Sequence, residues 1–146
     1  MKVVDAFWDS SALVPLCVSQ AATETLQGFY ARFSAVVWWA TPVEMESALA
    51  CLARSGTITP VVHAQARLAA EKIALDWSMI EASIAIAMEA RELLRVHDLR
   101  AADALQLAAA LAWCESKPGR EIFLTCDKIL GHAAGLAGFT VELILH

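Results

Sequence analysis

The sequence has no closely spaced pairs of cysteine or histidine, and this absence excludes several kinds of site. The four cysteines are far apart and include no C-x-x-C motif, which argues against a zinc site and favours reduced cysteines in the core of a cytosolic protein. The four histidines are equally scattered and form no pair at helical spacing. We therefore expect neither a histidine-based metal site nor a catalytic triad.

Long apolar runs and an excess of basic residues are also missing. No run of about 18 uncharged apolar residues occurs, so we expect no membrane-spanning segment. A lysine and an aspartate stand among the first five residues, where a signal peptide would have an apolar region, so we predict a cytoplasmic protein. The net charge of −5 is opposite in sign to that expected of a protein that binds phosphates strongly.

The 146 residues are 58% hydrophobic, which is enough for one folded domain spanning residues 1–146 and excludes a disordered chain. Apolar runs typical of strands alternate with helical segments, and no hairpin signal lies between the runs. This order predicts an α/β fold with a parallel sheet and helices on both faces. We expect strands within residues 2–8, 34–40, 122–126 and 139–145, a break at 76–79, and helices within 12–16, 23–33, 41–55, 59–75, 81–96, 101–114 and 128–136.

The segment 101–114 is apolar on all sides, which is typical of a buried helix. Asp103 is the only ionisable residue in it. An unpaired carboxylate in the core costs several kcal/mol, so Asp103 should be neutralised, hydrogen-bonded or bound to a metal. The alternative is that Asp103 lies in the first helical turn, where the helix dipole stabilises an acid by roughly 0.3–1 kcal/mol.

Three further acids stand at comparable places in the predicted fold. Asp9 and Asp127 directly follow strands, while Glu44, like Asp103, lies in the first turn of a helix. Each has a local explanation: the first two as N-caps, and Glu44 as the partner of Thr41 in a capping box. However, the carboxyl ends of parallel strands meet at one edge, so the four acids can converge there. A divalent cation such as Mg²⁺ or Mn²⁺ would hold such repelling carboxylates and act on phosphate groups.

The segments around these acids form a pattern. They are Asp9-Ser10-Ser11-Ala12-Leu13, then Glu44 before Ser47-Ala48-Leu49, then Leu99-Arg100-Ala101-Ala102-Asp103-Ala104-Leu105 with Leu107-Ala108, and finally Leu124-Thr125-Cys126-Asp127. In order and spacing they resemble the four acidic motifs of PIN-domain nucleases, and most closely those of the small VapC-type toxins of toxin–antitoxin pairs. The resemblance covers nearly the whole chain.

The resemblance implies a PIN-like α/β/α sandwich with a mostly parallel central sheet of four to five strands. It also implies an endoribonuclease that hydrolyses RNA with Mg²⁺ or Mn²⁺, a VapB-like antitoxin protein that inhibits it, and a homodimer. The residues that match are the catalytic acids Asp9, Glu44, Asp103 and Asp127, of which Asp9, Asp103 and Asp127 would bind the metal, and the supporting hydroxyls of Ser11 and Thr125.

Two positions depart from the family pattern, and two acids compete with the proposed ones. Pro15 stands where many relatives have a basic residue, and Gln106 where a histidine or aliphatic residue is common. We expect neither to touch the acids, so both bear on substrate contacts. Asp5 lies inside a strand, and Glu46 is two helical positions from Glu44 and should point elsewhere.

The composition leaves room for a local basic patch and an apolar interface. Setting aside the four proposed site acids leaves 12 acidic residues against 11 basic ones, so the remaining surface is near neutral. Candidates for substrate contact are Arg32, Arg54, Arg100 and Lys128. The five tryptophans, together with Phe7, Phe29 and Phe33, exceed what so small a chain needs to expose. Most of them should lie in the core, and we expect some at an interface.

Three other functions fit parts of the pattern. A PIN nuclease that processes RNA without being a toxin would have the same acids, and only a partner would distinguish it. A PIN-fold binding module without catalysis is opposed by the complete set of four acids. A phosphotransfer enzyme with Asp9 as nucleophile lacks a well-matched later lysine motif.

Overall fold

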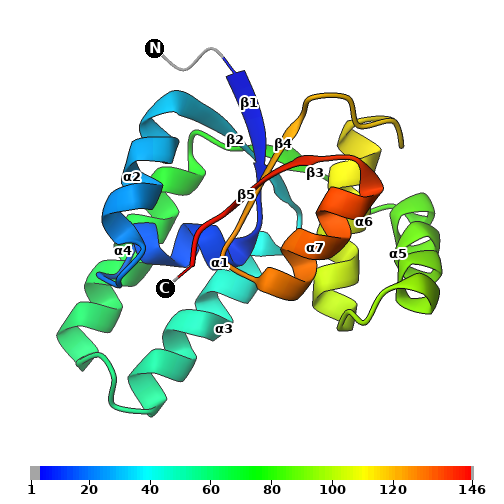
Figure 1. Cartoon of the computed structure of the whole chain (residues 1–146). Helices are drawn as coiled ribbons and strands as arrows, with labels where there is room; N and C mark the ends of the chain where they lie inside the picture. The colour runs from blue at the N-terminus through cyan, green and yellow to red at the C-terminus, as the bar shows by residue number, and fades with distance from the viewer. Residues whose placement is uncertain (1–3, 146) are drawn as a thin grey trace.

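A computed structural model describes residues 4–145. At its centre is a five-stranded sheet with the order β3-β2-β1-β4-β5, in which every neighbouring pair is parallel (Figure 1). The strands are β1 (Val4–Trp8), β2 (Phe33–Trp38), β3 (Ser78–Ile80), β4 (Ile122–Thr125) and β5 (Thr140–Leu143). The predicted parallel α/β fold is therefore confirmed.

Helices cover both faces of the sheet, which gives three layers (Figure 1). One face carries α1 (Ser10–Leu13), the 3-10 helix η1 (Val14–Leu16), α2 (Thr23–Arg32), α3 (Thr41–Arg54) and α4 (Pro60–Ala74). The other face carries α5 (Ile84–Val96), α6 (Ala101–Trp113) and α7 (Lys128–Ala137). Each layer of helices has its own apolar cluster against the sheet. The fold is an α/β/α sandwich, as the sequence predicted.

The first strand lies in the middle of this sheet. On one side Ala6 is in register with Ala35 of β2, and on the other with Ile122 of β4. Phe7 and Trp8 are fully buried, as expected for a strand covered on both faces. Asp9 directly follows this central strand, so it lies at the middle of the sheet edge.

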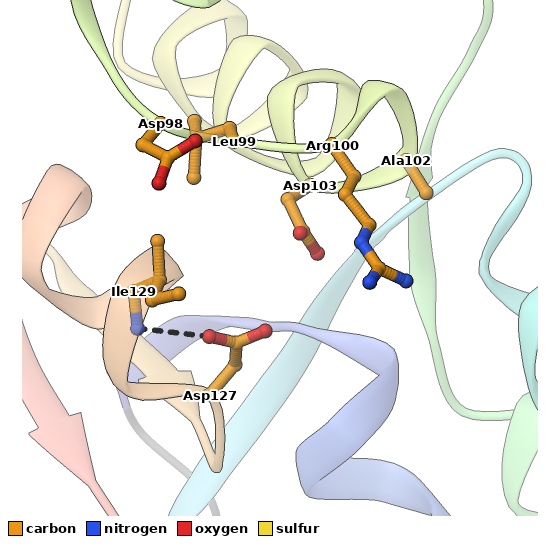
Figure 2. Close-up of a pocket in the computed structure, with 7 residues that line it drawn as sticks. All are labelled: Asp98, Leu99, Arg100, Ala102, Asp103, Asp127 and Ile129. Carbon is orange, nitrogen blue, oxygen red and sulfur yellow. Dashed lines mark hydrogen bonds between the residues drawn. The ribbon is translucent and has the colours of Figure 1, made fainter.

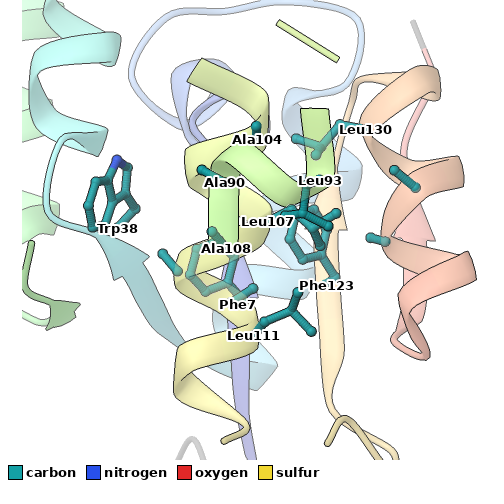
Figure 3. Close-up of a cluster of buried hydrophobic side chains, with 14 of the residues drawn as sticks. Phe7, Trp38, Ala90, Leu93, Ala104, Leu107, Ala108, Leu111, Phe123 and Leu130 are labelled. Atoms are coloured by element: carbon teal, nitrogen blue, oxygen red, sulfur yellow. The ribbon is translucent and has the colours of Figure 1, made fainter. Parts of the chain in front are cut away.

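Helix α6 forms the core of one layer (Figure 3). Leu107 is fully buried and lies in the same cluster as Phe7 and Phe123, whose rings stack with centroids 5.3 Å apart. The buried helix predicted from the sequence is confirmed between Ala104 and Leu111, but Ala101 and Ala102 are exposed. The start of α6 therefore emerges from the core at the turn that carries its only acid.

Some predicted boundaries are wrong. The expected break at 76–79 contains the short edge strand β3, in which Met79 pairs with Val37. Three residues are too few to show the alternation by which a strand is recognised. The helix expected from residue 81 begins only at Ile84, because the Ser83 hydroxyl accepts a hydrogen bond from the backbone N–H of Ile86 and caps it.

The cysteines and tryptophans are only partly where the sequence placed them. All four cysteines are free, as expected, but Cys51 is exposed and the others are half-buried, so none belongs to the core. Trp8 and Trp38 are buried, whereas Trp39 is 54% exposed. Between residues 4 and 145, no helix has the length and apolar character needed to cross a bilayer.

Candidate active site

The four predicted acids all lie at the edge of the sheet where β1, β2 and β4 end. Asp9 directly follows β1, and Asp127 comes two residues after the end of β4. Glu44 lies in the first turn of α3, and Asp103 in the first turn of α6. Parallel topology therefore brings together four residues that are far apart in the sequence, as predicted.

Asp9 is held by hydroxyl groups and does not cap its helix. Asp9 is buried, with only 3% of its surface exposed, and its side chain makes no capping hydrogen bond to α1. The hydroxyl of Ser11 donates to Asp9 Oδ2, and the hydroxyl of Thr125 donates to the same oxygen at 2.9 Å. The backbone N–H of Cys126 in turn donates to Ser11 Oγ at 2.9 Å. These contacts join the end of β1 to the end of β4.

Asp127 combines a capping role with a place in the site. Its Oδ1 accepts hydrogen bonds from the backbone N–H groups of Ile129 at 2.9 Å and Leu130 at 3.1 Å, so it is the N-cap of α7 (Figure 2). Its own backbone N–H donates to Thr125 Oγ1 at 3.0 Å. Because only Oδ1 caps the helix, Oδ2 is left for the pocket beside Asp103.

The predicted capping box at the start of α3 is wrong. Ala40 already has a helical conformation and is the N-cap, so Thr41 lies inside the helix and makes no cap. Its buried hydroxyl instead accepts a hydrogen bond from Gln106 Nε2 at 3.1 Å. The same nitrogen donates to Glu44 Oε1 at 2.6 Å. The expectation that Gln106 does not touch the acids is therefore wrong as well.

A pocket of about 660 Å³ opens between the starts of α6 and α7 (Figure 2). Asp103 and Asp127 face each other across it, and the guanidinium of Arg100 points into the same space. The residues that line it are Asp98, Leu99, Arg100, Ala102, Asp103, Asp127 and Ile129. Its walls thus offer three carboxylates, those of Asp98, Asp103 and Asp127, and the positive charge of Arg100 to a phosphate-containing ligand.

Burial and mutual repulsion raise the pKa values of three of the four acids. Burial raises the pKa of Asp9, and the carboxylates of Asp103 and Asp127 add to the rise, while two hydroxyl hydrogen bonds oppose it. Burial likewise raises the pKa of Glu44 and of Asp103. The charge of Asp127 adds to the rise at Asp103, and Arg100 opposes it. Such crowded, partly desolvated carboxylates call for a compensating cation.

The donor set suits a hard divalent cation. Every candidate ligand is a carboxylate or hydroxyl oxygen, which is the chemistry that Mg²⁺ and Mn²⁺ prefer. Within residues 4–145, no three His, Cys, Asp or Glu side chains lie close enough together to hold an ion as they stand. The residues fit the cation by their type and by their convergence at one edge of the sheet, where their charges act on each other.

The raised pKa of Asp103 predicts that its negative charge destabilises the metal-free fold. Folded protein holds this proton more tightly than unfolded protein, so stability falls as the pH rises above the unfolded value of about 3.9. In buffer with a chelator, Asp103→Asn should unfold at a higher temperature than wild type at pH 8. The difference should shrink towards zero near pH 3, where the carboxyl is protonated in both states.

Thermal unfolding followed by circular dichroism at several pH values tests this prediction. Asp98→Asn is the matched control, because it removes a carboxylate from the same pocket at an exposed position. A variant at Asp103 that is no more stable than the control at pH 8 would contradict the prediction.

The other charged candidates lie in different places. Arg32 stacks on the rings of Phe29 and Phe33, and Arg54 lies ten residues beyond Glu44 on α3, about 15 Å along the helix. Only Arg100 lines the central pocket, while Lys128 lines two neighbouring ones.

The competing acids lie away from the central pocket. The Glu46 carboxylate forms an ion pair of 2.7 Å with Arg67 on α4, and Asp5 is exposed within β1. Sequence reasoning had not assigned two further residues to the site: Gln106 contacts Glu44, and Asp98 lines the pocket. Gln106 left a usable signal, since it is a polar residue in an otherwise apolar helix.

A comparison with models of protein families identifies the family of this chain. The model of the PIN domain matches residues 6–136. The chain belongs to the PIN-domain family. The family predicted from the four acidic segments is thereby confirmed, and the sandwich described above is a PIN fold. No curated protein sequence matches the chain.

Several solved structures share this PIN fold. A chain of a toxin–antitoxin complex from Klebsiella pneumoniae is 19% identical, with a TM-score of 0.61, and the match covers 93% of this chain and 96% of that one. VapC20 of Mycobacterium tuberculosis, a toxin that cleaves the sarcin–ricin loop, is 19% identical with a TM-score of 0.66, covering 93% and 97%. The FitAcB structure from Neisseria gonorrhoeae gives 12% identity and a TM-score of 0.64, covering 93% and 95%. At these identities the similarity establishes the shared fold.

Proposed function

We propose that this PIN-domain protein is a metal-dependent endoribonuclease and the toxin of a VapC-type pair, active in the cytoplasm and inhibited by a VapB-like antitoxin protein. The observation that supports it most is the buried carboxylate of Asp9, which two hydroxyls fix beside Glu44, Asp103 and Asp127. Burying one acid beside three others destabilises the fold. A cation that acts on phosphate groups would compensate for these charges and give the site a function.

The relatives support the finer parts of this proposal. The Klebsiella chain comes from a complex with an antitoxin, and VapC20 is a toxin that cleaves RNA in the sarcin–ricin loop. A protein of the same fold with the complete acid set is expected to act on the same class of substrate. The RNA sequence that it cleaves is set by contacts outside the four acids.

The acids and hydroxyls of the site have different proposed roles. Asp9, Asp103 and Asp127 would hold Mg²⁺ or Mn²⁺, which when bound polarises the scissile phosphate and lowers the pKa of a water. Ser11 and Thr125 keep Asp9 in one orientation by donating to Oδ2. This fixed geometry avoids reorganisation during the reaction.

The remaining groups act on the substrate and on the attacking water. The guanidinium of Arg100 binds the non-bridging oxygens of an RNA phosphate in the pocket, where it points beside Asp103. Glu44, whose pKa is raised mainly by burial, accepts a hydrogen bond from the water that attacks the phosphate.

Apolar surface supports the two protein partners. Large apolar side chains are exposed on α4 at Val61 and Leu68, and on α5 at Ile84, Met88 and Val96. These surfaces are candidate contacts for the antitoxin and for a second copy of the chain, because exposed apolar residues on one helix are typical of protein interfaces.

Removal of the cation should abolish cleavage. Purified protein with RNA and Mg²⁺ should cut the strand internally, and an excess of EDTA should stop the reaction. Added Mn²⁺ or Mg²⁺ should restore it, whereas Ca²⁺, which prefers more ligands and a looser geometry, should restore it poorly. Product lengths on denaturing gels measure the outcome. Cleavage that persists in EDTA would overturn the metal dependence.

A further inference from the structure

Gln106 is the residue of α6 that enters the site from within the core. It lies one helical turn after Asp103, and its side chain is 1% exposed. From there it reaches across to α3, where its amide nitrogen contacts two oxygens of different residues, Thr41 Oγ1 and Glu44 Oε1. A carboxylate of the candidate site is thus connected to the buried side of the fold.

The orientation of this amide is fixed by its surroundings. Nε2 faces two oxygens, and rotating the group would place Oε1 against the Glu44 carboxylate, which is repulsive. In the observed orientation Oε1 is buried and has no hydrogen-bond partner among the described residues. An unsatisfied buried acceptor destabilises a fold, and an apolar side chain of the same length would avoid this cost. Packing alone therefore does not explain a glutamine at this position.

The contact with Glu44 is the short one of the pair. At 2.6 Å it joins an amide donor to a carboxylate, a class of hydrogen bond that is shorter and stronger than neutral ones. It engages Oε1, while the side chain of Ser10 and the charges of Asp9 and Asp103 also act on this carboxylate. The amide therefore sets the direction in which Glu44 presents its second oxygen.

We propose that Gln106 is a positioning residue that fixes the Glu44 carboxylate in the site through the hydrogen bond from Nε2 to Oε1. The inference rests on the proposed function, because it assigns Gln106 an effect on RNA cleavage that passes through Glu44. The Thr41 hydroxyl accepts a hydrogen bond from the same nitrogen and supports the amide from the other side.

The contact itself is tested without any reaction. In ¹⁵N NMR spectra of the metal-free protein, the side-chain NH₂ protons of Gln106 should be shifted downfield and exchange slowly with water. Glu44→Gln should move these resonances strongly, and a variant distant from the site, Glu24→Gln, should leave them in place. Resonances typical of a free amide in wild type would overturn the inference.

Cleavage kinetics then test the role. Gln106→Met keeps the length of the side chain and removes the donor, so kcat should fall about 10-fold with an unchanged KM for RNA. In the background of Glu44→Gln the same change should have no further effect, because the carboxylate it positions is gone. Gln27→Met, which makes the same chemical change at an exposed position on α2, is the matched control and should cleave like wild type. Circular dichroism confirms that each variant is folded.

The outcomes separate the two proposals. A wild-type protein that cleaves no RNA overturns the proposed function and this inference with it. A wild-type protein that cleaves, together with a Gln106→Met variant of equal kcat, overturns the inference alone. A loss of the same size in the background of Glu44→Gln also overturns it, since the effect would then not pass through Glu44.

Discussion

RNA cleavage should fall roughly 100-fold or more when Asp103 is replaced by asparagine. Loss of a group that merely orients a metal ligand already costs about 10–100-fold, and Asp103 is proposed as a ligand itself. Asparagine keeps the shape of the side chain at the start of α6 and removes its charge, so the pocket loses the carboxylate that faces Asp127. Initial rates on a labelled RNA, measured over a range of Mg²⁺ concentrations, give the effect.

Asp98→Asn provides the matched control for this experiment. Asp98 lines the same pocket from an exposed position five residues earlier, and the control therefore makes the same chemical change without touching the first turn of α6. It should cleave RNA at close to the wild-type rate. Equal rates for wild type and Asp103→Asn would remove Asp103 from the reaction and with it the proposed metal site.

Leu107→Ala should lower the free energy of unfolding by about 2–5 kcal/mol, the largest stability effect that we predict. Leu107 is fully buried in the cluster that joins α6 to β1 and β4, so truncation leaves a cavity that rigid neighbours such as Phe7 and Phe123 cannot fill (Figure 3). Each kcal/mol corresponds to about 2–4 °C in Tm for a domain of this size. Urea titration followed by tryptophan fluorescence measures the loss.

Leu68→Ala is the control of the same chemistry on the surface. Leu68 is 66% exposed on α4, and its truncation should change the unfolding free energy by no more than about 0.5 kcal/mol. Equal losses for the two variants would mean that α6 does not lie in the core.

Much of the fold follows from patterns that are local in the sequence. The continuous apolar run within 34–40 predicted a strand covered on both faces, and the parallel order followed from the helices between the strands. Asp9 and Asp127 were found as site candidates because their place after a strand fixes their place in space. Local patterns are sufficient here because the carboxyl ends of parallel strands always lie at the same edge of the sheet.

The errors concern contacts between distant segments. The sequence Thr41-Pro42-Val43-Glu44 has the form of a capping box, yet both of its polar side chains bond to Gln106, which lies 62 residues beyond Glu44. No feature of the residues around Thr41 and Glu44 indicates such a distant partner. The short strand β3 was missed for a related reason, since its three residues are a strand only because β2 lies beside them.

The central position of β1 has a consequence for how the molecule is made. One neighbour of this strand begins at residue 33, but the other begins at residue 122, and the hydroxyl that holds Asp9 belongs to Thr125. A nascent chain on the ribosome thus carries its first acid long before the segment that completes the acid's surroundings has been synthesised. Such distant pairings are also slow to form. Until that late segment docks, the growing polypeptide contains no assembled pocket, so the proposed ribonuclease activity would be absent while the chain is still on the ribosome.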